Sequence, residues 1–208
     1  MPLTILVLEN PWNANTFDSL SVLPFVEGLA RYSPDSVRVF TKPFYHAEEL
    51  GHWLADFRRP RRGIGRRVVY VAAHGTAGRV GGLPDGTGAI NFRTFHHLLR
   101  SAGHIEGVHL GCCDFGNIEN AERILRPDRR RARHVPCRWV AGYDRYIDWF
   151  QSTLVDLVFW RELLRRSDHS AWKASLKTYK EYPRSRELGF RVFQNGPGGR
   201  LEDSSKAG

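Results

Sequence analysis

A chain of 208 residues is long enough to bury one sizeable hydrophobic core, so a single domain is the first expectation. With 41% hydrophobic and 25% charged residues, its composition is that of an ordinary globular protein, which excludes a disordered chain or a membrane protein. The net charge of +9 comes mainly from arginine, since the chain has only five lysines.

The apolar segments are too short to enter a membrane. The first of them, residues 4–8, lacks the basic start and the length of a signal-peptide core, and no later run approaches the length that spans a bilayer. Of the three cysteines, Cys112 and Cys113 are adjacent, and Cys137 leaves an odd count for disulfides. We therefore expect a cytoplasmic protein without membrane contact, whose cysteines are free thiols and could serve as nucleophiles.

Short β-rich apolar runs alternate with segments of helical periodicity in the first part of the chain. In chain order we predict a strand at residues 4–8, a helix at 21–32, a strand at 36–40, a helix at 47–57 and a strand at 67–73. The last of these, RVVYVAA, is the strongest strand signal in the sequence. A glycine-rich excursion follows it over residues 76–88, and its Pro-Asp-Gly turn predicts a hairpin.

The same alternation continues to the end of the chain. The remaining predicted elements are a helix at 92–102, a strand at 105–111, a helix at 117–125, a strand at 137–143, helices at 148–166 and 170–182, and a strand at 189–193. Gly103 is suited to end the first of these helices, and Asp148 with Gln151 forms a capping-box pattern at the start of another.

Strands that alternate with helices predict an α/β fold, a doubly wound and mostly parallel sheet with helices on both faces. We assign residues 1–194 to this one domain and expect the polar, glycine-rich tail from residue 195 to be frayed. Ligands of such sheets bind beyond the carboxyl ends of the strands. His74 and Cys113 each follow a predicted strand, and the two strands are consecutive, so both side chains should lie at one sheet edge.

A histidine close to a cysteine can activate the thiol for nucleophilic catalysis. A thiol becomes a strong nucleophile when a positive partner or a helix N-terminus lowers its pKa. Cys113 would have both if the next helix begins just after it and His74 lies across the cleft. The small residues Gly75, Gly111 and Gly116 would let a substrate approach the backbone, where free N–H groups could stabilise an oxyanion.

Three segments resemble the caspase-like (clan CD) cysteine peptidases, and most closely their bacterial CHAT-type members. VVYVAAHGTAGRVGGL is similar to the His-Gly strand, VHLGCCDFGN to the strand that carries the catalytic Cys, and VAGYDRYIDWFQSTL to the region that shapes the specificity pocket. The likeness covers residues 68–163 and implies a caspase-like fold. It also implies His74 as general base or acid, Cys113 as nucleophile, and the amides of Gly75 and Cys113 as the oxyanion hole.

The sequence around the cysteine differs from that of true caspases, which carry Gln-Ala-Cys-Arg-Gly. Here Gly111 and Cys112 precede Cys113, and Asp114 and Phe115 follow it, so the resemblance gives little support for cleavage after aspartate.

Carboxylates gather around the expected pocket for the residue before the scissile bond (P1). Asp114, Asp144 and Asp148 fall in or near it, against one nearby base, Arg145. Because Asp148 is needed as a helix cap, Asp114 and Asp144 are the free pocket candidates. A carboxylate attracts Arg or Lys, so we expect a basic P1 residue.

Each of these residues also has a purely structural interpretation. A buried cysteine is usually an inert small hydrophobe, which is our expectation for Cys112 and the alternative for Cys113. His74 could simply bond the backbone. His96 and His97 are adjacent on a helix and no Cys/His spacing repeats, so we predict no metal, and no cofactor is implied.

Two arginine clusters carry much of the positive charge: the first is bounded by Arg58 and Arg67, the second by Arg123 and Arg133. Either could bind the phosphates of a nucleic acid, although no aromatic residues are interleaved to stack bases, which favours solvated loops. The leading hypothesis is a cysteine endopeptidase that cleaves a protein partner, of the kind found in bacterial stress or defence systems. A catalytically silent interaction module and a nucleic-acid-binding domain are the alternatives.

Overall fold

The computed structural model describes residues 2–12, 20–32, 37–59, 65–83, 86–126 and 137–207. Seven strands form one central sheet: β1 (Leu3–Glu9), β2 (Val37–Pro43), β3 (Arg67–Ala72), β7 (Gly107–Gly111), β8 (Trp139–Tyr143), β9 (Phe190–Asn195) and β10 (Leu201–Asp203). The helices are α1 (Leu23–Tyr32), α2 (Ala47–Arg58), α3 (Phe92–Ser101), α4 (Ile118–Leu125), α5 (Trp149–Arg165), α6 (Ala171–Glu181) and α7 (Arg184–Glu187). The short 3₁₀ helices η1 (Pro197–Gly199) and η2 (Ser204–Lys206) flank β10.

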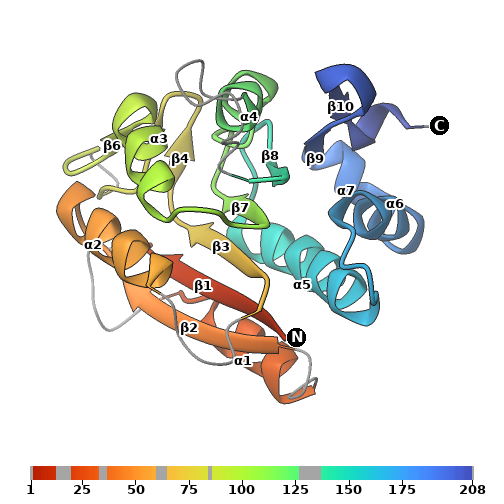
Figure 1. The fold of residues 1–208 in the computed structure, drawn as a ribbon, viewed down its shortest axis with the longest axis horizontal. Coiled ribbons are helices and arrows are strands. Elements are labelled where there is room, and N and C mark those ends of the chain that lie inside the picture. Colours follow the sequence, from red (N-terminus) through yellow and green to blue (C-terminus); the bar gives the residue numbers. More distant parts are fainter. Residues whose placement is uncertain are drawn as a thin grey trace.

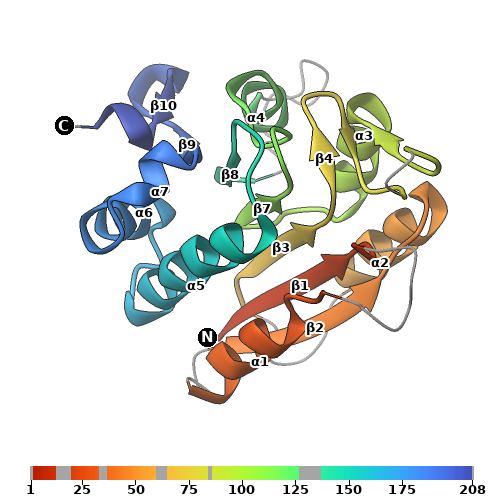
Figure 2. The same ribbon diagram turned by 180° about the vertical axis from the view of Figure 1, so that it is seen from behind.

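The order of the strands in the sheet is β10-β9-β8-β7-β3-β1-β2. The five strands from β8 to β2 are parallel to one another, β9 is antiparallel to β8, and β10 is antiparallel to β9. Helices α2 and α3 cover one face, and α1 and α5 cover the other (Figures 1 and 2). The predicted α/β fold with a mostly parallel sheet is therefore confirmed.

Both faces of the central sheet are buried, which explains why its strands could be recognised in the sequence as apolar runs. In β1, Leu6 and Leu8 join the core under α2 and α3, whereas Ile5 and Val7 join the core under α5. Successive side chains of a strand point to opposite faces, so a strand covered on both sides is a continuous apolar run.

The helix boundaries follow the capping residues. Asp148 accepts hydrogen bonds from the backbone N–H groups of Phe150 and Gln151, as the capping-box pattern predicted. Asn117 caps α4 in the same way, and Gly103 follows the end of α3 with a φ of +74° that favours glycine.

The glycine-rich excursion after β3 forms a small antiparallel sheet rather than a single hairpin. Its strands are β4 (Gly75–Thr76), β5 (Arg79–Val80) and β6 (Ile90–Asn91), in the order β4-β5-β6. Residues 84 and 85 of the predicted Pro-Asp-Gly turn lie outside the described residues.

The tail from Asn195 is not frayed as we expected from its composition. It forms β10 against β9, and Ser204 at the start of η2 is fully buried, with its hydroxyl accepting the backbone N–H of Val192 at 2.9 Å. Asp203 is also buried and bonds Arg191. The polar side chains that suggested a solvated tail have partners on β9, which composition does not reveal.

A polar cluster lies inside the core on the α5 side of the sheet. The Asp156 carboxylate on α5 accepts hydrogen bonds from the hydroxyls of Tyr70 (2.7 Å) and Tyr143 (2.6 Å). His109 approaches it to 2.9 Å without hydrogen-bond alignment. Burial, and then the charge of Asp156, raise the pKa of both tyrosines well above the usual 10.0.

Replacing Tyr143 with Phe is expected to reduce the loss of stability at alkaline pH. The raised pKa keeps Tyr143 protonated in the folded state above pH 10.0, where it ionises on unfolding, so the free energy of unfolding falls as the pH rises. Each such tyrosine contributes a slope of about 1.4 kcal/mol per pH unit. Urea unfolding between about pH 10 and pH 11.5 should show a shallower slope for Y143F than for wild type.

The matched control is Y32F, because Tyr32 is 80% exposed. It should retain the wild-type slope, and an equal slope in Y143F and wild type would contradict the assignment.

Candidate active site

The register between β3 and β7 brings His74 and Cys113 to the same sheet edge. Ala72 pairs with Gly111 at the carboxyl ends of the two neighbouring strands, and His74 and Cys113 each lie two residues beyond this pair. The backbone N–H of Ala73 still donates to Gly111 O at 3.4 Å, so the two segments leave the sheet side by side.

Gly75 packs directly against the backbone of the cysteine. A Cβ atom at Gly75 would lie 2.6 Å from the carbonyl oxygen of Cys113 and 2.8 Å from the Cβ of Cys112. Only glycine allows this approach. The position of a Gly75 Cβ is also 3.2 Å from the amide nitrogen of Cys113, so the two residues implied as an oxyanion hole are neighbours in space.

The contacts of His74 define which ring nitrogen can act as a base. Its Nε2 lies 2.7 Å from the carbonyl oxygen of Trp12, and its ring meets the Trp12 indole edge to face at 5.1 Å. A carbonyl oxygen can only accept, so in the neutral imidazole Nε2 carries the proton and Nδ1 has the lone pair. Sequence reasoning missed Trp12; its only signal is that it follows β1, the neighbour of β3 in the sheet.

Cys113 is half-buried, and its thiol donates a hydrogen bond to the carbonyl oxygen of Ile147 at 3.3 Å. Burial, with a smaller contribution from the charge of Asp114, raises the pKa of the thiol. The expectation of a lowered pKa is therefore wrong. Helix α4 begins only at Ile118, and its cap Asn117 accepts the N–H of the first turn. Among the described residues, no hydrogen bond joins the thiol to a cationic side chain.

The turn after Cys113 is fixed by the loop of residues 144–148, between β8 and α5. Asp114 has a φ of +52°, and its backbone N–H donates to Arg145 O at 3.0 Å. Gly116 lies against the end of β8, where an added Cβ would clash with the amide nitrogen of Tyr143. The loop that was expected to shape the pocket thus also holds Cys113, the predicted nucleophile; it is called the nucleophile loop below.

The two pocket candidates differ in their contacts. One carboxylate oxygen of Asp144 bonds Arg145 Nε at 3.1 Å, and the other pairs with Arg191 of β9. The expectation that Asp144 is free is therefore wrong, because the antiparallel strand β9 brings in a base that is remote in sequence. The Asp114 carboxylate has no ion pair among the described residues, which leaves it as the pocket candidate.

The other cysteines are structural. Cys112 and Cys137 are buried, and burial raises the pKa of each thiol well above its usual value. The Cys112 thiol donates to Val71 O at 3.4 Å, so it points into the sheet and away from the edge. In the described part of the chain, no group of three His, Cys, Asp or Glu side chains is arranged to hold a metal ion.

The described arginines of the two clusters are largely engaged within the protein. Arg66 pairs with Glu106, and Arg67 donates to the carbonyl of Arg58 at 2.9 Å. In the second cluster Arg126 pairs with Glu122 at 2.7 Å, whereas residues 127–136 lie outside the described residues. No helix within the described ranges is both long and apolar enough to cross a bilayer.

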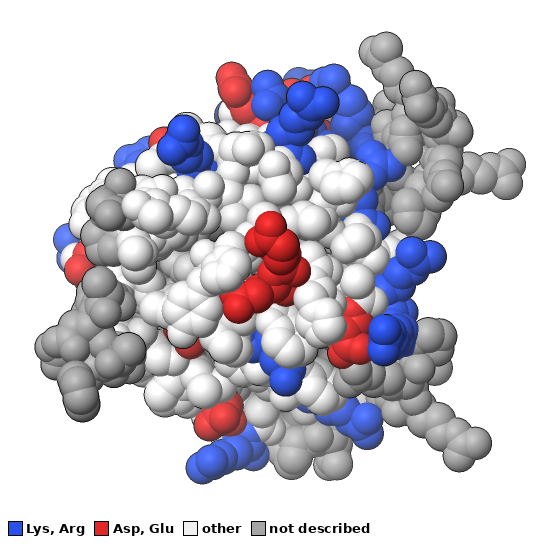
Figure 3. All heavy atoms as spheres, turned by 90° about the vertical axis from the view of Figure 1, so that its left-hand side faces the viewer, with Lys and Arg blue, Asp and Glu red and all other residues white. Residues whose placement is uncertain are grey.

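Figure 3 shows the side of the molecule to which the carboxyl ends of β1 and β2 point. Uncharged surface dominates it, a small group of carboxylates lies near its middle, and most lysines and arginines lie toward its rim.

No model of a known protein family and no curated protein matches this sequence. The structure is similar to the X-ray structure of a secreted C11 cysteine protease from Bacteroides thetaiotaomicron in complex with an irreversible peptide inhibitor. The TM-score is 0.63 at 12% identity, and the match covers 93% of this chain but only 66% of that one. The likeness shows that the chain has the α/β fold of a caspase-like peptidase; it does not single out the CHAT type.

Gly75→Ala is expected to disturb the contact between the two strand ends. The added Cβ would meet backbone atoms of Cys113, which cannot turn aside as a flexible side chain could. Overpacking of this kind costs about 1–3 kcal/mol. Gly78→Ala is the matched control in the same excursion, since nothing lies within 4 Å of its Cβ position. Thermal unfolding should separate the two variants, and equal stabilities would show that the strand ends are not in tight contact.

Proposed function

We propose that this protein is a cysteine endopeptidase in which Cys113 is the nucleophile and His74 the general base. The observation that supports it best is the geometry of His74, whose Nε2 is bonded to Trp12 O while Nδ1 is left to accept a proton. Gly75 brings this segment into backbone contact with Cys113. The caspase-like fold is consistent with the proposal.

The raised pKa of Cys113 defines the resting state as a neutral thiol. His74 Nδ1 then takes the S–H proton as the sulfur forms a bond to the carbonyl carbon of the substrate. The C–N bond breaks, His74 returns the proton to the leaving amine, and water hydrolyses the remaining thioester. In this scheme the Trp12 carbonyl stabilises the imidazolium, and the amides of Gly75 and Cys113 donate to the oxyanion.

We further propose a protein substrate with a basic P1 residue. Asp114, which has no ion pair among the described residues, follows the proposed nucleophile directly in the chain, and a carboxylate there favours a basic side chain. From the resemblance of the His74 and Cys113 segments to CHAT-type proteases, we place the enzyme in the bacterial cytoplasm as an effector of a stress or defence system.

An electrophilic peptide probe, an acyloxymethyl ketone with arginine at P1, should label the protein at Cys113. Labelling should disappear in Cys113→Ala and should slow by about 100-fold or more in His74→Ala, because a general base contributes at least that factor. Intact-mass and peptide mass spectrometry measure the site and the rate. Cys112→Ala is the matched control and should retain labelling, because that thiol is buried. Labelling of a folded H74A variant at the wild-type rate would contradict the proposed base.

The second candidate is a catalytically silent caspase-like module, a protein that binds a partner without cleaving it. The raised pKa of Cys113 and the direction of its thiol toward Ile147 O favour it. The two candidates separate in the same experiment. A silent module would react with iodoacetamide at high pH, as any half-exposed thiol does, but not with the peptide probe.

The P1 preference is tested with fluorogenic peptides that carry Arg, Lys, Asp or Leu at P1. Asp114→Asn should lower kcat/KM for P1 Arg relative to P1 Leu by about tenfold or more, the value of one charge-assisted hydrogen bond. Glu119→Gln, which removes an exposed carboxylate in the first turn of α4, controls for the change in net charge. Preferred cleavage after Asp, or an Arg/Leu ratio that D114N leaves unchanged, would rule out this pocket.

A further inference from the structure

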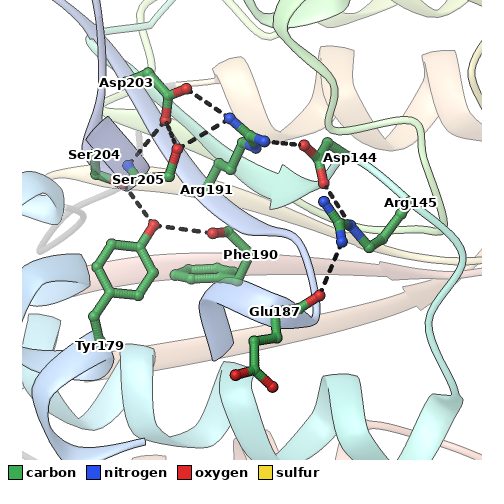
Figure 4. Close-up of polar contacts among 9 residues, drawn as sticks. All are labelled: Asp144, Arg145, Tyr179, Glu187, Phe190, Arg191, Asp203, Ser204 and Ser205. Atoms are coloured by element: carbon green, nitrogen blue, oxygen red, sulfur yellow. Dashed lines mark hydrogen bonds and ion pairs between the residues drawn. The ribbon is translucent and has the colours of Figure 1, made fainter. Parts of the chain in front are cut away.

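Arg191 of β9 joins two parts of the chain that are far apart in sequence (Figure 4). Its guanidinium pairs with the Asp144 carboxylate on one side. On the other side it bonds Asp203 Oδ2 at 2.8 Å and the Ser205 hydroxyl at 3.0 Å. The side chain is only 24% exposed, so these contacts are made in a partly desolvated place.

The Asp144 side of this bridge is the nucleophile loop. Asp144 is its first residue, and the backbone N–H of Asp144 donates to Gly189 O at 3.1 Å. Further along the loop, the carbonyl of Arg145 accepts the N–H of Asp114, and the carbonyl of Ile147 accepts the thiol of Cys113. A displacement of the loop would therefore move the acceptor of the thiol hydrogen and the turn that carries the thiol.

The Asp203 side of the bridge is the C-terminal segment made of β10 and η2. Asp203 caps η2 by accepting the backbone N–H of Ser205 at 2.9 Å. The neighbouring Ser204 hydroxyl bonds both Val192 N and Tyr179 Oη, which ties the segment to β9 and α6. Asp203 is therefore a fixed anchor rather than a mobile surface carboxylate.

The charges make Arg191 necessary to this arrangement. Burial lowers the pKa of its guanidinium, but the Asp144 and Asp203 carboxylates more than offset this, and the net pKa is raised. Without the guanidinium, two shielded carboxylates would lose their shared counter-ion, and Asp144 would retain Arg145 alone. The loop and the C-terminal segment would then no longer be joined through this bridge.

We propose that Arg191 is a positioning residue that fastens the nucleophile loop to the C-terminal segment and thereby sets the orientation of the Cys113 thiol. The inference rests on the proposed function, since it concerns the same nucleophile. It makes β10 and η2, which touch no catalytic residue, a determinant of how Cys113 reacts.

Two reagents, iodoacetamide and the peptide probe, distinguish this positioning role from a simple loss of stability, because their rates at Cys113 should change in opposite directions. A released loop exposes the thiol, so its pKa falls toward the ordinary value and iodoacetamide at pH 8 reacts faster with Cys113. The peptide probe needs an aligned thiol, and misplacement of a reacting group by about 1 Å costs about 100-fold. Arg191→Met should therefore raise the iodoacetamide rate several-fold and lower the probe rate by about 10- to 100-fold.

The matched control is Arg161→Met, which removes an arginine that also pairs with two carboxylates, Glu162 and Glu181. It should leave both rates at Cys113 unchanged, and Arg191→Lys should recover part of the probe rate. Asp203→Asn loosens the bridge while Arg191 remains paired with Asp144. It should therefore shift both rates in the same directions as Arg191→Met, but by a smaller factor. If a melting experiment shows that R191M is not folded, the test is made with R191K and D203N instead.

The positioning role would be overturned if Cys113 reacted with iodoacetamide and with the peptide probe at the same rates in R191M and D203N as in R161M. A fall in both rates together with the melting temperature would also overturn it, because it would show a purely structural contact. If wild type takes no peptide probe, the proposed endopeptidase fails, while the iodoacetamide rates and hydrogen exchange at the Asp114 amide still decide whether Arg191 controls the loop.

Discussion

The candidate site depends on the parallel pairing of β3 with β7. Because Ala72 pairs with Gly111, the histidine and the cysteine leave the sheet at the same height on adjacent strands. This register is fixed by burial on both faces, since Val69 and Val71 face one core and Val68 and Tyr70 the other. A slip by one residue would exchange these faces, so the hydrophobic effect determines which residues meet at the edge.

Features that arise from local sequence could be predicted, and those that arise from long-range pairing could not. Apolar runs and caps such as Asp148 placed the strands and helices, and the positions of His74 and Cys113 after consecutive strands followed from them. Trp12 is 62 residues from the histidine it orients, and Arg191 reaches Asp144 only because β9 joins the sheet antiparallel to β8. No local periodicity encodes either contact.

The state of the thiol shows why a residue's neighbours in sequence are a poor guide to its pKa. A cysteine before a helix and near a histidine suggested a lowered pKa. Desolvation decides the outcome when, as among the described residues, no cation bonds the sulfur. The described contacts of the Cys113 thiol lead to a carbonyl, and those of the His74 ring lead to Trp12. In the proposed reaction the thiol proton has to move during attack, so the alignment of the thiol matters more than its charge at rest.

The nucleophile loop is held by polar contacts at the end that follows β8. At the end of β8, the Tyr143 hydroxyl bonds Asp156 and the carbonyl of Ser152 on α5, and beyond it Asp144 is paired with Arg191. Apolar packing fixes how the layers stack but tolerates small shifts, whereas hydrogen bonds and ion pairs weaken steeply with distance and angle. Directional contacts therefore hold the chain where it leaves β8, and in the proposed arrangement the orientation of Cys113 depends on partly buried polar groups that make no contact with its sulfur.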